Sequence, residues 1–260
     1  MNYQSTESPA KLWNLSNQIL YNAMYDANPT KFLAHSSKAI AKFYKGRPLW
    51  LYISDDFSTK NIRNFIQNCQ NVHSLHLTEM SGIITSQRAA QVCLEFMPTA
   101  KYWDIVAMYL PTVISDSNSQ NRLVLPTLSH LPIICSWIKN FYKDALLQSL
   151  PTQNCERLAT ALIKGKKIYC LQTPQLTALQ AMGMQTPLPN AINRLNLIYV
   201  PPESRNKGFA KDIVTLIVNR LQKQGQMPVL YARVDNAPAM QLYKSLGFVE
   251  VGRLTELRFI

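Results

Sequence analysis

The stretch "YVPPESRNKGFAKDIVTLIV", residues 199–218, joins an extended segment to a helical pattern through two prolines and a glycine. Apolar residues downstream recur at spacings of three and four, which predicts an amphipathic helix that begins at about Gly208 or Phe209. These apolar residues are Ala210, Ile213, Val214, Ile217, Val218 and Leu221. Gly225 follows where a glycine commonly ends a helix. The stretch therefore predicts a strand, a loop and a helix in that order.

Two explanations account for Gly208. The first N–H groups of a helix have no partner within it and carry the positive end of its dipole, so a residue without a side chain lets a phosphate approach them. Arg205 and Lys207 would add positive charge beside it. Alternatively, the glycine only relieves a tight turn between strand and helix. The residues themselves leave both explanations open.

The composition indicates a globular chain. Its 260 residues, 47% of them hydrophobic, suit one large domain or two of about 130 residues. We expect a cytoplasmic protein without membrane contact, because no apolar run approaches ~20 residues and the first residues do not resemble a signal peptide. Five widely spaced cysteines without a CxxC pair argue against disulfides and zinc. His73 and His76 lack a third ligand, so no metal is expected.

Positive charge is concentrated in the second half of the chain. Residues 1–130 carry 11 Lys and Arg against 8 Asp and Glu, whereas residues 131–260 carry 16 against 7. The second half therefore favours an anionic partner, either a phosphorylated small molecule or a nucleic acid, unless these charges only solvate the surface. Nucleic acid is the less favoured of the two, because no arginine-rich run or basic stripe with interleaved aromatic residues is present.

The order of expected elements is mixed α/β. A polar connection at 113–122 separates two halves, and we place the domain boundary there, giving domains 1–120 and 121–260. The first half is expected to contain helices near 11–25, 30–45 and 59–70 and strands near 48–54, 74–80 and 102–110. The second half is expected to contain helices near 130–148, 209–224 and 237–246, and strands near 122–127, 166–172, 176–184, 191–200 and 227–234, with a last strand pair from Phe248.

The loop and a downstream segment together resemble a known family. Arg205, Asn206, Lys207, Gly208, Phe209 and Ala210 resemble the pyrophosphate-binding motif R/Q-x-x-G-x-G/A of the GNAT superfamily of N-acetyltransferases. "NAPAMQLYKSLGF" (236–248) is similar to a second element of that family at Asn236, Ala239, Leu242, Tyr243, Gly247 and Phe248. The two motifs occur in the family's order, separated by one helix and one strand. The resemblance covers residues 121–260 well and the first half poorly.

This resemblance implies a mixed, mostly antiparallel sheet flanked by helices, with acetyl-coenzyme A as cosubstrate. In the family, the strand before the loop separates from its neighbour at a bulge and pairs through its backbone with the pantetheine arm. Here Ile198, Tyr199 and Val200 would supply those contacts, and the Val200 N–H would polarise the thioester carbonyl. Residues 205–210 would bind the pyrophosphate, and Asn236 would also contact the cofactor. The basic second half fits the phosphate charges of coenzyme A.

The implied reaction is direct transfer of an acetyl group to an amine of a small molecule or peptide. Tyr243 matches the tyrosine that protonates the leaving thiolate, since a phenol with a pKa near 10 keeps its proton at pH 7. It could instead be a core aromatic residue, because Ala239, Leu242 and Leu246 share its helical face. No general base is identified, since residues 191–200 contain no glutamate. Glu156 and His130 would reach the site only through an unforeseen fold.

The role of the first half is open. By analogy with two-domain relatives, residues 1–120 would form a degenerate acetyltransferase-like domain, and a simple structural extension fits as well. A non-catalytic acyl-coenzyme A binder is the alternative to an enzyme. The identity of the acceptor, the acyl chain preference and the oligomeric state cannot be read from the residues.

Overall fold

A computed structural model describes residues 31–35, 39–43, 48–71, 82–96, 101–112, 119–188 and 190–258. These residues divide into two compact units. One unit, here called the loop unit because it contains the loop at residues 205–208, consists of Tyr109–Tyr231 and Asn236–Val249. The other, the terminal-strand unit, contains the described residues before Tyr109 together with Ala232–Asp235 and the last strand.

Five neighbouring strands of the sheet belong to the loop unit. They are β6 (Arg122–Val124), β7 (Ile168–Thr173), β8 (Leu176–Leu188), β9 (Ile192–Tyr199) and β10 (Met227–Arg233), in the spatial order β10-β9-β8-β7-β6. Neighbours from β6 to β9 are antiparallel, and β10 is parallel to β9. A parallel pair needs a crossover between its strands. The helix predicted from residues 209–224 supplies it, as α6 (Phe209–Lys223).

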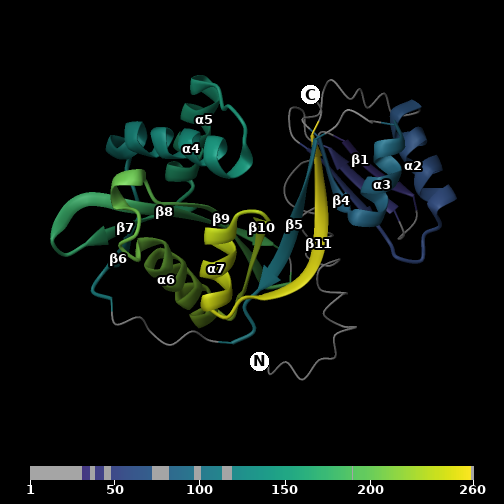
Figure 1. Cartoon of the computed structure of the whole chain (residues 1–260). Coiled ribbons are helices and arrows are strands. Elements are labelled where there is room, and N and C mark those ends of the chain that lie inside the picture. Colours follow the sequence, from purple (N-terminus) through teal and green to yellow (C-terminus); the bar gives the residue numbers. More distant parts are fainter. Residues whose placement is uncertain are drawn as a thin grey trace. The chain divides into compact units, whose positions relative to one another are not determined.

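Helices cover both faces of this sheet (Figure 1). α4 (Leu131–Leu146) and α5 (Thr152–Lys164) lie on one face, and α6 lies on the other. α7 (Ala237–Ser245) follows β10, and two short 3-10 turns, η3 (Leu128–His130) and η4 (Pro202–Ser204), precede α4 and α6. The core beneath α4 and α5 consists of Ile134, Cys135, Trp137, Ile138, Cys155, Ala159, Leu162, Ile163, Ile168, Cys170, Leu179, Met182, Leu197 and Tyr199.

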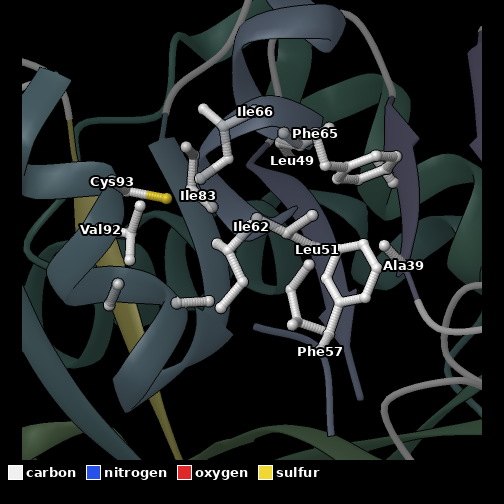
Figure 2. Packing of buried hydrophobic residues seen from close by; sticks show 14 of the residues in the cluster. Ala39, Leu49, Leu51, Phe57, Ile62, Phe65, Ile66, Ile83, Val92 and Cys93 are labelled. Carbon is white, nitrogen blue, oxygen red and sulfur yellow. The ribbon is translucent and has the colours of Figure 1, made fainter. Parts of the chain in front are cut away.

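The terminal-strand unit has six of the described strands and its own core. β1 (Lys31–His35), β2 (Ala39–Phe43), β3 (Leu49–Ile53), β4 (Gly82–Ser86), β11 (Val249–Arg258) and β5 (Lys101–Tyr109) lie side by side in that order. Figure 2 shows side chains of α2 (Thr59–Asn71) and α3 (Gln87–Phe96) pointing toward strands of this sheet. Leu257, from the last strand of the chain, belongs to the same core and is fully buried.

The last strand links distant parts of the sequence. β11 pairs antiparallel with β4, from Leu254 opposite Ser86 to Arg258 opposite Gly82. The backbones approach closely at that end, because a Cβ on Gly82 would clash with the Leu257 carbonyl oxygen. The two units are therefore not consecutive halves of the chain. The boundary predicted near residue 120 refers to domains that fold independently. The division into compact units does not test that, so the boundary stays a prediction.

The predicted fold class, a mixed and mostly antiparallel sheet flanked by helices, is confirmed. The helix predicted at 30–45 is wrong, because β1 and β2 pair there, and pairing between strands overrides the helix propensity of Ala and Lys. α3 and α5 were not predicted. A last pair of strands was predicted from Phe248, but the described chain has one ten-residue strand there, β11. The helix predicted at 11–25 and the strand predicted at 74–80 lie outside the described residues. No helix among the described residues is long and apolar enough to cross a membrane.

Candidate functional site

A β-bulge in β9 lies just before the loop. Met182 of β8 is opposite Tyr199, and Met184 is opposite Asn196, so Leu197 and Ile198 together face the single residue Gly183. Leu197 has the left-handed φ of 50° that such an extra residue can adopt. Bulges of this kind bend a strand and increase its twist, and this one lies at the position where the resemblance implies one.

The ladder between β9 and β10 ends before the bulge. Its register runs from Ile192 opposite Met227 to Leu195 opposite Leu230. β9 continues for four more residues, 196–199, and the described part of β10 has no ladder partner for them. A strand edge left open in this way can pair with an extended ligand chain through its backbone N–H and C=O groups.

The loop after β9 is held in place from β8. The hydroxyl of Ser204, in η4, donates to Gln180 Oε1 at 2.9 Å, and both residues are buried. Two loop residues then adopt left-handed conformations, Asn206 with φ 61° and Gly208 with φ 80°. The loop is therefore shaped by specific backbone conformations and anchored to the sheet.

Gly208 is the N-cap of α6 and supplies no side-chain cap. The first helical bond runs from the Asp212 N–H to the Gly208 carbonyl at 3.1 Å, so the N–H groups of residues 209–211 have no partner within the helix. A Cβ on Gly208 would meet nothing within 4 Å. Its φ alone accounts for a glycine, and the open space beside it accommodates an anion, so both sequence explanations fit this residue.

Arg205 and Lys207 contact protein groups of the loop unit. Arg205 Nε donates to the Val200 carbonyl at 3.1 Å, and Arg205 Nη2 donates to Asp144 Oδ2 of α4 at 3.0 Å. Lys207 Nζ donates to the Glu203 carbonyl at 2.9 Å. Both side chains are exposed, as is Asn206. They place positive charge around the helix terminus while also fixing the loop.

The three predicted backbone-contact residues occupy the open end of β9. Ile198 is half-buried and points toward α6, since its Cδ1 would lie 3.0 Å from a Cβ on Gly183, close to Ile217. Tyr199 is buried on the opposite face, in the core beneath α4. Val200 follows directly and is half-buried. The structure thus brings residues 198–200 to the strand edge that leads into the loop.

Tyr243 and Asn236 belong to α7. Tyr243 is 8% exposed, its ring packs edge-on against Phe248 with centroids 5.7 Å apart, and burial raises its pKa to about 12. Asn236 is the N-cap of α7, and its side chain accepts from the Ala239 N–H at 3.3 Å. Each residue therefore has a structural role, and a role toward a ligand stays a prediction for both.

The two residues considered as possible general bases from the sequence, His130 and Glu156, lie neither on β9 nor in the loop that follows it. His130 accepts at Nδ1 from the Thr127 N–H at 3.1 Å, which closes the turn before α4, and Glu156 is exposed on α5. His73 and His76 lie outside the described residues. Among the residues described, no group of three or more His, Cys, Asp or Glu could hold a metal ion, and the cysteines at 93, 135, 155 and 170 are free and buried.

Three contributors to the site were missed by sequence reasoning. Asp144 pairs with Arg205 across 61 positions of the chain, a contact without a local signal. Leu197 gives no sign of its left-handed conformation, because leucine rarely adopts one. Gly183, the third, did carry a signal in the sequence. A glycine inside a predicted strand often marks a bulge or a close approach of another backbone.

Comparison with known proteins identifies the architecture. The model of the FR47-like protein family matches residues 178–258. A GNAT-family acetyltransferase from Colwellia psychrerythraea is 14% identical, each chain covering 98% of the other, with a TM-score of 0.58. A GCN5-related N-acetyltransferase from Kribbella flavida is 10% identical, with 98% of this chain and 96% of that chain covered and a TM-score of 0.58.

A Drosophila protein is 8% identical, with 99% of this chain and 92% of that chain covered and a TM-score of 0.62. No curated protein matches the chain by sequence. At these identities the likeness establishes the fold, and that fold is the one found in GNAT acetyltransferases.

Proposed function

We propose that this protein is an acetyl-coenzyme A-dependent N-acetyltransferase that transfers the acetyl group to a primary amine of a small molecule or peptide by direct attack. One observation carries the proposal. The open edge of β9 beyond Leu195 leads, within about fifteen residues, to the uncapped N-terminus of α6. An extended chain that ends in phosphates, as coenzyme A does, matches both features at once.

The cofactor would be held mainly by backbone groups. Residues 198–200 would pair with the pantetheine arm, and the N–H groups of Gly208, Phe209 and Ala210 would receive the pyrophosphate. Lys207 and Asn206, both exposed, lie beside that position. Arg205 would exchange its contact with Asp144 for a phosphate oxygen, an exchange between two exposed partners that costs little.

The reaction needs a donor for the thioester carbonyl and an acid for the sulfur. The Val200 N–H is the donor at the end of β9. Tyr243 is the acid, and burial, by raising its pKa to about 12, ensures that it carries its proton at neutral pH. No residue is assigned as general base, so the amine would enter neutral or lose its proton to water.

A second candidate is a non-catalytic acyl-coenzyme A binding module. It is favoured by the absence of a carboxylate on β9 and by the packing of Tyr243 against Phe248, which suits a core residue. The two candidates share the cofactor and differ only in turnover.

Calorimetric titration with acetyl-coenzyme A tests the shared part of both candidates. The informative variants are Gly208→Glu and Gly225→Glu, because both glycines have positive φ and open space where a Cβ would lie, yet they lie at opposite ends of α6. We expect micromolar binding that is lost in Gly208→Glu and kept in Gly225→Glu. Equal loss in both variants, or no binding by the wild type, would contradict the phosphate site.

Release of coenzyme A thiol with a panel of amines then separates the two candidates. Spermidine, glucosamine, lysine and a lysine-containing peptide sample small-molecule and peptide acceptors. Amine-dependent thiol release establishes the transferase. Tight binding without release with any of these amines favours the binding module.

A further inference from the structure

The hydroxyl of Tyr199 is buried and has no hydrogen-bond partner among the described residues. The side chain is 5% exposed. Tyr169, also 5% exposed, shows the usual situation, since its hydroxyl accepts from Gln185 Nε2 at 3.1 Å. Buried hydroxyls are normally paired, and phenylalanine would fill the same volume without the unpaired group. The Tyr199 hydroxyl therefore indicates a partner that the described residues do not supply.

Tyr199 lies at the end of β9, beyond both the bulge and the last β9–β10 pair. Its ring is in the core beneath α4, with its centroid 6.4 Å from that of Trp137. The preceding residue, Ile198, points to the α6 face. The hydroxyl thus lies on the α4 side of the strand edge to which the proposed function assigns the thioester.

Stereochemistry restricts how an acceptor can reach that thioester. In the proposed function the thioester carbonyl accepts from the Val200 N–H, and a nucleophile attacks a carbonyl carbon roughly at right angles to the carbonyl plane. With the cofactor paired along the strand edge, the acceptor would then approach from one face of the sheet. On the α6 face beside the bulge, Ile217 and Ile198 pack closely over Gly183, where a Cβ would lie 2.7 Å from Ile217 Cδ1 and 3.0 Å from Ile198 Cδ1. The α4 face is also packed, but there the buried Tyr199 hydroxyl, which no described residue pairs, is a polar group that an acceptor could contact.

We infer that the acceptor amine approaches from the α4 face and that the Tyr199 hydroxyl accepts a hydrogen bond from its N–H, which orients the nitrogen lone pair toward the thioester carbon. The inference rests on the proposed function. In the step, the nitrogen–carbon bond forms and the carbon–sulfur bond breaks. The amine loses one proton to water, the thiolate gains one from Tyr243, and Tyr243 regains a proton from water. Tyr199 keeps its own proton and acts by contact with the substrate.

Protein atoms cover the Tyr199 hydroxyl, so a neighbouring side chain must turn when the acceptor binds. Arg205 suits this movement. Its guanidinium carbon lies 5.8 Å from the Tyr199 ring centroid, and its side chain is 47% exposed. Release of Arg205 from Asp144 by a phosphate would uncover the ring, which couples cofactor binding to access for the amine.

The test uses hydroxylamine, a small nucleophile that is uncharged at neutral pH, with acetyl-coenzyme A at saturation and thiol release corrected for the uncatalysed reaction. For Tyr199→Phe we expect kcat/KM for hydroxylamine to fall about tenfold, which corresponds to one lost hydrogen bond. The calorimetric Kd for acetyl-coenzyme A should stay within about twofold, and Tm should not fall, because no paired hydroxyl is removed.

Tyr169→Phe is the matched control. It removes a paired hydroxyl of equal burial, so Tm should fall by a few degrees while kcat/KM stays unchanged. Equal kcat/KM in Tyr199→Phe and the wild type, with acetyl-coenzyme A bound, overturns the inference and leaves the proposed function standing. A wild type that binds no acetyl-coenzyme A overturns the proposed function, and the inference with it.

Discussion

Arg205 and Asp144 form an ion pair, with Arg205 Nη2 3.0 Å from Asp144 Oδ2, that joins the loop before α6 to the last turns of α4. Both side chains are 47% exposed. A pair exposed to this degree contributes about 0–1 kcal/mol to the free energy of unfolding. Its importance lies in where it holds the guanidinium, beside the helix terminus assigned to the pyrophosphate.

Asp144→Asn should raise the affinity for acetyl-coenzyme A. It releases Arg205 for a phosphate oxygen and removes a nearby negative charge, so Kd should fall by up to about fivefold, or ~1 kcal/mol. Calorimetry measures the change. Glu95→Gln breaks a comparable exposed pair with Arg63 in the terminal-strand unit and should leave Kd unchanged. A weaker affinity in Asp144→Asn would show that the ion pair organises the site rather than competing with the ligand.

Gly183→Ala should destabilise the loop unit. The added Cβ would lie 2.7 Å from Ile217 Cδ1, and overpacking of this kind costs about 1–3 kcal/mol of unfolding free energy. Ile217→Val removes that Cδ1, so the double variant should be more stable than the sum of the single changes by about 1 kcal/mol. Urea unfolding of the three variants measures this coupling energy. If the two changes in unfolding free energy are strictly additive, β8 shifts to accommodate the added Cβ and the contact with Ile217 Cδ1 is not the cause.

Leu257→Ala should cost about 2–5 kcal/mol, because this residue of the last strand is fully buried in the core of the terminal-strand unit. Val249→Ala, at the exposed start of the same strand, should change stability by less than about 0.5 kcal/mol. For the same reason, a fragment of residues 121–260 would carry β11 without β4 and should aggregate. A soluble, cooperatively unfolding fragment would contradict this and support the boundary near 120.

Tyr243→Phe separates the catalytic from the structural explanation of this residue. If Tyr243 protonates the thiolate, kcat should fall by about 10²-fold or more while Kd for acetyl-coenzyme A is unchanged. Steady-state kinetics with the best amine of the panel measures this. Unchanged kcat would leave Tyr243 as a core aromatic residue packed on Phe248.

The same variant should alter stability at alkaline pH. The pKa of Tyr243 is raised by burial from 10 in the unfolded chain to about 12, so the folded state binds more protons between these values. The resulting contribution is fully present below pH 10 and is lost as pH rises toward 12. Tyr243→Phe should therefore lose less stability than the wild type from about pH 9.5 to about pH 11 in urea unfolding. Parallel losses would show that Tyr243 does not titrate with a shifted pKa.

Much of the loop unit could be predicted because its signals are local. The helical spacing from Ala210 to Leu221 sets α6, and Gly208 and Gly225 lie at its two ends with the positive φ that favours glycine. α5 was missed although its buried positions, Cys155, Ala159, Leu162 and Ile163, follow the same helical spacing. β1 and β2 were misread as a helix because strand pairing depends on the partner strand rather than on local propensity.

The sequence by itself determined the strand, loop and helix around Gly208 and the mixed α/β order of elements, because turn chemistry and hydrophobic periodicity act over a few residues. The tertiary structure alone decided that β11 completes the sheet of β4, that the β9–β10 ladder stops at Leu195, and that Asp144 meets Arg205. It also decided that Tyr199 is buried with a hydroxyl that no described residue pairs. These features depend on contacts between residues tens of positions apart, which local spacing does not encode.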